Sequence, residues 1–224
     1  MLVHIPAVLT PEQAAQCRQA LDAAQWVDGR ASAGSTAARV KNNQEIPTSH
    51  PVAQQWGQAI LNALAASPMF VATALPLKFA APMFNRYQVG ETYGTHNDAA
   101  LFNVPGAVVR ADLAATIFLT PPGEYDGGDL TIEDMYGVQQ VKLPAGDMIL
   151  YPAWSLHRVQ PVTRGARISS FLWLQSMVRE DEKRALLVQL DRARANLNRE
   201  MPDNPGIVQM LGVYHNLLRM WSET

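Results

Sequence analysis

The middle of the chain, from about residue 77 to 176, alternates short apolar runs with clusters of Pro and Gly. The apolar runs are rich in β-branched and aromatic residues and have the lengths of strands. The candidate strands span residues 78–88, 113–120, 128–133, 138–143, 147–151, 157–162 and 167–175. Several short strands joined by turns are typical of a sandwich or barrel, so this region predicts a mainly β core.

Turn-forming sequences separate these runs. "PPGEYDGGD" (121–129) is dense in turn residues, while "MYG" (135–137) and "LPAGD" (143–147) predict hairpin turns. The "DGGD" at 126–129 has a faint likeness to a calcium loop but lacks the spaced ligands of one, so we interpret it as a tight turn.

Two helices are expected before the β region. The stretch Thr10 to Gln13 reads as an N-cap, a first-turn proline and a capping-box glutamine, and apolar residues then recur at helical spacing. A second helix follows Pro51, with apolar residues on one face. The polar segment 28–50 predicts an irregular loop with a short strand around residues 38–41.

Two amphipathic helices are expected after residue 176, separated by "MPDNPG". The predicted apolar faces consist of Leu186, Leu190, Ala193 and Leu197 in the first helix and Ile207, Leu211, Tyr214, Leu218 and Trp221 in the second. These helices either cover the sheet or form a dimer contact. We therefore expect a main domain at residues 1–176 and a helical extension at residues 177–224.

Composition limits the partners and the compartment. Lys and Arg number 18 and Asp and Glu number 20, and there is no long basic run, so no nucleic-acid partner is expected. No long apolar span or signal-peptide pattern is visible, so we expect no membrane association and a cytoplasmic protein. Cys17 is the single cysteine, which excludes an internal disulfide, and its helical context predicts a buried apolar role.

The stretch "NRYQVGETYGTHND" (85–98) ends in His96-Asn97-Asp98. In a strand or extended turn, residues i and i+2 point to the same side, so an imidazole and a carboxylate face one point in space. His157, which should begin a strand after a Pro-containing turn, is the best candidate for a third ligand. Two histidines and one carboxylate form the facial triad of non-haem Fe(II) oxygenases, which leaves positions open for co-substrates.

Arg167 lies ten residues after His157, in "GARISSFLW". A strand arginine there could reach the same cavity and pair with a dicarboxylate through its planar guanidinium. Arg158 and Arg164 are rivals, but both lie closer to a turn and are expected to be solvated.

Other residues are weaker candidates for the site. A surface or structural role is expected for three histidines, His4, His50 and His215. Trp154 and Trp173 could line a substrate pocket, although the core of a β-sandwich is the expected place for Trp173.

The spacing from Tyr87 through Gly90, Tyr93 and His96 to Asp98 resembles the motif of the prolyl-hydroxylase-like Fe(II)/2-oxoglutarate dioxygenases. "YDGGDLTIEDMYG", "VKLPAGDMILYPAWSLHRVQPVTRGARISSFLW" and the C-terminal helices resemble the bacterial PKHD-type hydroxylases. The resemblance spans nearly the whole chain. Members of that family are often linked to iron uptake.

This resemblance implies a fold, a reaction and a set of roles. The fold would be a double-stranded β-helix, or jelly roll, with helices outside. His96, Asp98 and His157 would bind Fe(II). Arg167 would hold 2-oxoglutarate, Tyr87 would line the same pocket, and Tyr93 would shape the approach to the metal.

The implied reaction uses 2-oxoglutarate and O2 as co-substrates, with ascorbate as a candidate reductant, to hydroxylate a small-molecule or peptide substrate. A homo-oligomer through the C-terminal helices is a further expectation. Three alternatives stay open at this point: a non-enzymatic iron or 2-oxoglutarate sensor, a zinc hydrolase, and an interaction domain.

Overall fold

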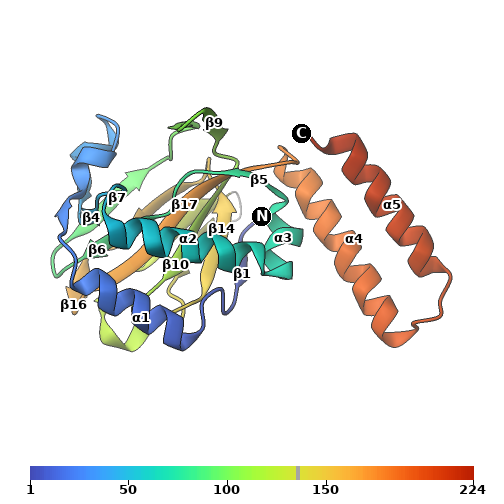
Figure 1. Ribbon diagram of the computed structural model, residues 1–224, viewed down its shortest axis with the longest axis horizontal. Coiled ribbons are helices and arrows are strands. Elements are labelled where there is room, and N and C mark those ends of the chain that lie inside the picture. Colours follow the sequence, from blue (N-terminus) through green and yellow to red (C-terminus); the bar gives the residue numbers. More distant parts are fainter. Residues whose placement is uncertain (135–136) are drawn as a thin grey trace.

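The protein, described here from a computed structural model covering residues 1–134 and 137–224, has a core of two facing antiparallel sheets (Figure 1). In the described residues the larger sheet has eight strands, in the order β1 (Val3–Ile5), β14 (Met148–Pro152), β10 (Leu113–Phe118), β17 (Arg167–Ser176), β6 (Met83–Tyr87), β4 (Gln44–Ile46) and β2 (Val27–Asp28), with β5 (Pro76–Phe79) also paired to β17. The smaller sheet has the order β13 (Gly137–Val141), β12 (Leu130–Asp134), β15 (Leu156–Val159), β7 (Thr92–His96) and β3 (Lys41–Asn42).

Among the described residues, two short ribbons accompany the sheets: β8 (Leu101–Val104) with β9 (Ala107–Arg110), and β11 (Asp126–Gly127) with β16 (Val162–Arg164). The α-helices are α1 (Pro11–Asp22), α2 (Pro51–Ala65), α3 (Pro68–Ala74), α4 (Asp181–Glu200) and α5 (Gly206–Trp221). Three short 3-10 turns are η1 (Gly29–Ser32), η2 (Ala37–Arg39) and η3 (Pro122–Glu124). The predicted mainly β core with flanking helices is confirmed.

Strand β10 shows how the layers are built. Its side chains alternate between two hydrophobic clusters because successive strand residues face opposite ways. Leu113, Ala115 and Ile117 belong to a cluster with residues of α1, α2 and α3, on the outer face of the larger sheet. Ala114 and Phe118 belong to the cluster between the two sheets. Both faces are therefore covered, and all six residues of β10 are buried.

The predicted helix starts are confirmed. Thr10 caps α1, and its hydroxyl and the Gln13 side chain form the reciprocal capping box. α2 begins at Pro51, and the preceding His50 accepts a hydrogen bond from the backbone N–H of Val52. Cys17 is fully buried in the cluster beneath α1, as predicted.

The candidate strand at 78–88 is divided into β5 and β6, which both pair with β17. Ala80 still donates a backbone hydrogen bond to Trp173, at 2.9 Å. Pro82 has no N–H to donate, so the ladder is interrupted before β6 begins. The prediction of one continuous strand was wrong at this point.

The strand expected around 38–41 is also displaced. Residues Ala37–Arg39 form the 3-10 turn η2, and only Lys41 and Asn42 pair with β7. Alanine and arginine favour helical conformations, and the chain reaches the edge of β7 only at Val40, whose carbonyl accepts a hydrogen bond from Gly94.

Of the two hairpin turns expected at 135–137 and 143–147, only the second can be compared with the structure. Residues 143–147 contain a turn, closed by a hydrogen bond from the Asp147 N–H to the Pro144 carbonyl. This turn connects β13 of the smaller sheet to β14 of the larger sheet, so it is not a hairpin. The hairpin predicted at 135–137 falls on residues 135–136, which lie outside the described residues; the flanking strands β12 and β13 pair antiparallel.

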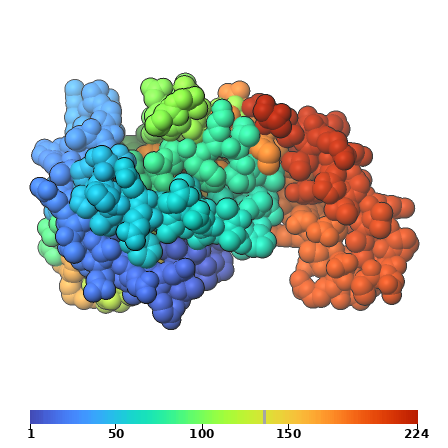
Figure 2. Space-filling model, viewed as in Figure 1, coloured from blue at the N-terminus to red at the C-terminus, as the bar shows by residue number. Residues whose placement is uncertain are grey.

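The C-terminal helices α4 and α5 lie side by side and form a lobe beside the sheets (Figures 1 and 2). The lobe joins the body through a small cluster that includes Leu75, Val178 and Leu187, with Tyr214 and Trp221 packed against it. The predicted face of α4 was wrong, because Leu186 is exposed while Leu187 is buried. The lobe does not cover either sheet.

Among the helices of residues 1–134 and 137–224, none combines the length and hydropathy that crossing a membrane requires.

Candidate active site

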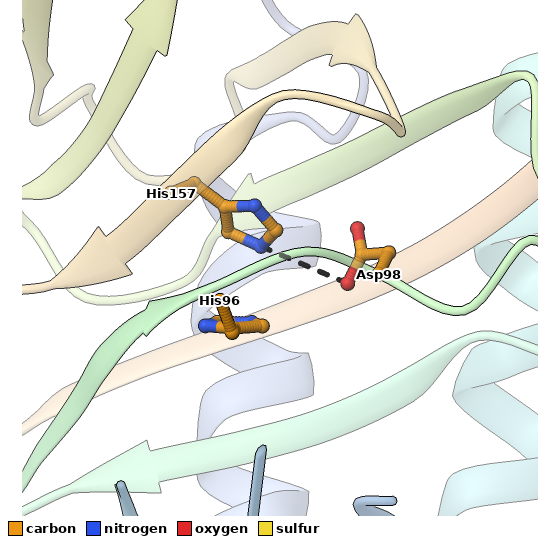
Figure 3. Close-up of side chains that lie close together, drawn as sticks. All are labelled: His96, Asp98 and His157. Atoms are coloured by element: carbon orange, nitrogen blue, oxygen red, sulfur yellow. Dashed lines mark ion pairs between the residues drawn. The ribbon is translucent and has the colours of Figure 1, made fainter. Parts of the chain in front are cut away.

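His96, Asp98 and His157 come together in the structure (Figure 3). His96 ends β7 and His157 lies opposite it on β15, because the two residues are register partners in the smaller sheet. Asp98 follows two residues after the end of β7. One potential ligand atom from each side chain lies within 4.8 Å of those of the other two. The strand and turn geometry expected for this trio is therefore present.

Hydrogen bonds fix the chemical form of both imidazoles. His96 Nδ1 lies 2.8 Å from the Gly94 carbonyl oxygen, and His157 Nδ1 lies 3.0 Å from that of Ser155. A carbonyl oxygen only accepts, so each Nδ1 must donate. In the neutral rings this leaves Nε2 with a lone pair for a metal ion, which is the arrangement that second-shell partners give to metal-binding histidines.

The carboxylate of Asp98 is enclosed and incompletely paired. One oxygen lies 3.7 Å from His157 Nε2. The other oxygen, Oδ2, is buried and has no hydrogen-bond partner among the described residues. Burial raises the pKa of Asp98, and this outweighs the lowering caused by His157 and Trp173. A buried carboxylate oxygen without a partner is costly unless a cation occupies the site, so the donor set fits a divalent metal.

The environment of His96 also favours the neutral, ligating imidazole. Burial, followed by the proximity of His157, lowers the pKa of His96 to about 3. The ring stacks on Tyr93, with centroids 3.6 Å apart and planes inclined by 14°. Tyr93 thus contacts a potential metal ligand directly.

Arg167 begins β17 and lines the same cavity, whose volume is about 390 Å³. Its side chain is fully buried, and Nη1 donates to Ser169 Oγ at 2.7 Å. Ser169 in turn donates to Asn85 Oδ1 on β6. The Nε of Arg167 is buried without a partner in the part of the chain that the structure describes. A buried guanidinium with an unused N–H suits a carboxylate ligand.

Tyr87 is the register partner of Arg167 and lines the cavity beside it. The Arg167 guanidinium carbon lies 5.4 Å from the centre of the Tyr87 ring. The tyrosine is almost completely buried, and this burial raises the pKa of its hydroxyl well above the usual range. Tyr87 is therefore a neutral hydrogen-bonding group next to the arginine.

The weaker candidates lie elsewhere. Arg158 pairs with Glu133, and Arg164 pairs with Asp126 on the surface. His4 is within 2.7 Å of Asp147, and His215 is exposed on α5. None of these four residues lines the cavity.

Only one of the two tryptophans that could line a pocket does so. Trp154 is exposed on the turn before β15 and does not line the cavity. Trp173 lines the cavity and stacks on Phe102, with ring centroids 4.1 Å apart. Trp173 also packs against the hydrophobic cluster between the two sheets, so the expected core position is confirmed and the side chain borders the cavity as well.

Other lining residues were missed by sequence reasoning. Asn85 and Ser169 stand two residues from Tyr87 and Arg167 on the same strands, so strand parity could have identified them. Lys41 and Glu45 come from the polar segment 28–50, where Lys41 ends the expected short strand and no periodic signal marks either side chain as facing a cavity.

Comparison with known proteins identifies the family. A profile described as "2OG-Fe(II) oxygenase superfamily" matches residues 82–175, and one described as "PKHD-type hydroxylase C-terminal domain" matches residues 181–223. The chain is 53% identical to a PKHD-type hydroxylase of Methylobacillus flagellatus, over 100% of both chains. It is 56% identical to a PKHD-type hydroxylase of Burkholderia ambifaria, also over 100% of both chains.

Solved structures support the fold. A prolyl-4-hydroxylase of Pseudomonas putida aligns with a TM-score of 0.52 and 21% identity, over 78% of this chain and 92% of that one. A prolyl hydroxylase of Trichoplax adhaerens, solved with a peptide fragment of hypoxia inducible factor, aligns with a TM-score of 0.55 and 15% identity, over 83% and 86%. The expected jelly-roll core is confirmed.

The family defines the reaction and its co-substrates. Its members require Fe(II), 2-oxoglutarate and O2, and the donor set of His96, Asp98 and His157 is chemically suited to Fe(II). The full-length identity and both family profiles point to one conclusion: the chain belongs to the PKHD-type hydroxylases and is an Fe(II)- and 2-oxoglutarate-dependent dioxygenase.

Proposed function

We propose that His96, Asp98 and His157 hold the Fe(II) ion and that Arg167, with Tyr87 beside it, holds 2-oxoglutarate. One observation carries this proposal: the three potential metal ligands and the buried arginine line a single cavity between the two sheets. When bound there, Fe(II) with 2-oxoglutarate and O2 supplies oxidative decarboxylation coupled to hydroxylation.

Formal charges support this assignment. Two neutral imidazoles and the Asp98 carboxylate leave a bound Fe(II) site with one positive charge, and Arg167 contributes a second. The dianion 2-oxoglutarate balances both charges. A buried site that becomes neutral when it fills avoids the cost of enclosing an uncompensated charge.

The protein's own groups hold and orient the reactants. His96 and His157 present Nε2 because each Nδ1 is committed to a backbone carbonyl. Arg167 can offer its guanidinium N–H groups to the far carboxylate of 2-oxoglutarate, while Ser169 fixes Nη1. The centre of the Phe118 ring lies 5.2 Å from the Arg167 guanidinium carbon, and this ring helps to exclude water.

For the primary substrate we propose a small molecule or a peptide. The cavity is lined by the arginine and also by aromatic side chains, among them Phe102, Phe171 and Trp173. One structural neighbour was solved with a peptide fragment. We further propose a link to iron uptake or homeostasis and a stimulation by ascorbate, both on the basis of the family resemblance.

Equilibrium binding tests the assignment without the need for the primary substrate. Under anaerobic conditions, Fe(II)-loaded protein should bind one 2-oxoglutarate per chain in isothermal titration. His157→Ala should lose the metal, and Arg167→Ala should keep the metal but lose 2-oxoglutarate. If Arg167→Ala bound 2-oxoglutarate as tightly as the wild type does, another group would have to hold the co-substrate.

We also propose that residues 1–176 form the catalytic domain and residues 177–224 an extension that contacts a second copy of the chain. In support, residues 177–224 contribute no lining residue to the cavity, and the α4–α5 lobe exposes Val208, Val213 and Met220. Sedimentation of the wild type and of Val208→Glu across a range of concentrations tests the contact. A wild-type protein that stays monomeric at the highest concentration would contradict the proposed contact between two copies.

A further inference from the structure

A short segment near the N-terminus connects the two sheets at the wall of the cavity. β3 extends the smaller sheet by pairing with β7, and β4 extends the larger sheet by pairing with β6. Only Asn43 lies between β3 and β4, so the chain passes from one sheet to the other within a single residue. This segment precedes residues 82–175, the part matched by the oxygenase profile.

An ion pair spans this crossing inside the cavity. Lys41 of β3 donates to Glu45 of β4 at 2.5 Å, and also to Ser32 Oγ at 2.8 Å. Both charged side chains are only 5% exposed, and both line the cavity. The pair therefore links the edge strand beside the metal ligands to the sheet that carries Arg167.

A buried ion pair is a weak source of stability. The desolvation of two charges offsets most of their attraction, and well-packed apolar residues often do as well or better. A contribution to stability therefore does not explain why two charged side chains lie in the cavity wall. A role in the site has to be sought in the contacts that these side chains make.

Those contacts lead from Lys41 to a metal ligand in two steps. Lys41 is the register partner of Tyr93, and its ammonium lies 5.2 Å from the centre of the Tyr93 ring. The Tyr93 ring in turn stacks on His96, with centroids 3.6 Å apart. The same segment also holds Gly94, two residues before His96. The Gly94 N–H donates a hydrogen bond to the Val40 carbonyl, and the Gly94 carbonyl accepts one from His96 Nδ1.

We propose that Lys41 and Glu45 are positioning residues for the metal centre, which hold Tyr93 flat against His96 and thereby fix the direction of His96 Nε2. This inference rests on the proposed assignment of His96 as a metal ligand. Neither residue touches the metal or 2-oxoglutarate in this account, and the positioning effect passes through Tyr93. The charge of Lys41 also acts directly on His96 and Asp98, but a nearby ammonium repels a cation, so its loss would strengthen metal binding rather than weaken it.

The test compares three metal-free proteins: the wild type, Lys41→Met and Lys41→Met/Glu45→Gln. The affinity of each for Co(II), whose absorption reports on the site, is measured by titration. The double variant avoids a buried, unpaired glutamate and keeps the test valid if the single variant unfolds. The matched control is Lys183→Met/Glu180→Gln. Lys183 also pairs with a glutamate and lies 5.8 Å from the centre of an aromatic ring, Trp221, but far from the cavity.

Both cavity variants should bind Co(II) about tenfold more weakly or worse, in line with the losses seen when partners of metal ligands are removed. Their Co(II) absorption bands should change, and the control should match the wild type. Adding Lys41→Met to Tyr93→Leu should cause no further loss, because the link to His96 is already absent.

Two other outcomes separate the possible failures. Wild-type Co(II) affinity and spectrum in the double variant, whatever its melting temperature, would overturn the positioning role and leave only a structural one. Equal Co(II) affinities for the wild type and His96→Ala would instead overturn the proposed metal site itself.

Discussion

His96 and His157 are direct partners on neighbouring antiparallel strands, with their ring centroids 4.2 Å apart. Antiparallel pairing places two distant parts of the sequence at one point and aims both side chains at the same face. Asp98 completes the trio from the loop that follows β7. The position of the proposed metal centre thus follows from strand register in the smaller sheet.

Replacing any member of this trio should remove the metal. His157→Ala should lower the affinity for Fe(II) or Co(II) by at least about 100-fold, because two ligands cannot replace three, and second-shell changes alone cost about 10- to 100-fold. Metal titration followed by absorption measures the loss. His4→Ala is the control, since His4 pairs with Asp147 away from the cavity. Equal losses in both variants would indicate general damage.

Arg167→Ala should raise the KM for 2-oxoglutarate. A charge-assisted pair in a buried site contributes about 2–4 kcal/mol, which corresponds to about 30- to 1000-fold. Steady-state succinate formation over a range of 2-oxoglutarate concentrations gives the value. Arg164→Ala, which breaks only an exposed pair with Asp126, should leave KM unchanged. A larger effect at Arg164 would reverse the assignment.

Gly128→Ala should damage both stability and the co-substrate pocket. Gly128 has a φ of +66°, and a Cβ there would lie 3.2 Å from the Arg167 Cδ and 3.1 Å from Tyr125. The left-handed conformation alone costs an alanine about 1 kcal/mol. Thermal melting and 2-oxoglutarate titration measure the two effects. Gly123→Ala, with no neighbour within 4 Å, is the control and should change neither.

The Cys17 thiol should react only when the protein unfolds. Burial raises its pKa to about 12, so the folded protein carries almost no thiolate near pH 8. The unfolded thiol ionises at a lower pH than the folded one. The contribution of Cys17 to the free energy of unfolding therefore falls as the pH rises from about 9 to 12. Labelling with a thiol reagent, with and without denaturant, checks the prediction. Fast labelling of the native protein would contradict it.

The sequence predicts the parts of this fold that have a periodic or capped signal. Thr10 and Gln13 mark the start of α1 because both capping partners are local in sequence. The strands carrying His157 and Arg167 are recognisable because apolar runs and turns delimit them. The family resemblance then adds the reaction, which spacing alone cannot supply.

The sequence fails where tertiary contacts decide. β3 and β4 are only two and three residues long, so nothing in the polar segment 28–50 reveals that Lys41 and Glu45 face the cavity. The hollow beside Trp173 depends on how far apart the two sheets stand. The exposure of Leu186 depends on how α4 docks against the body, which a helical pattern does not encode.

Succinate formation tests the central claim most directly. Anaerobically purified, Fe(II)-loaded protein is given O2 and 2-oxoglutarate, alongside an equally folded Asp98→Ala variant. The account predicts succinate that depends on Fe(II) and 2-oxoglutarate in the wild type, and none above background in the variant. An Asp98→Ala protein that forms succinate at the wild-type rate would contradict the assignment of the metal centre.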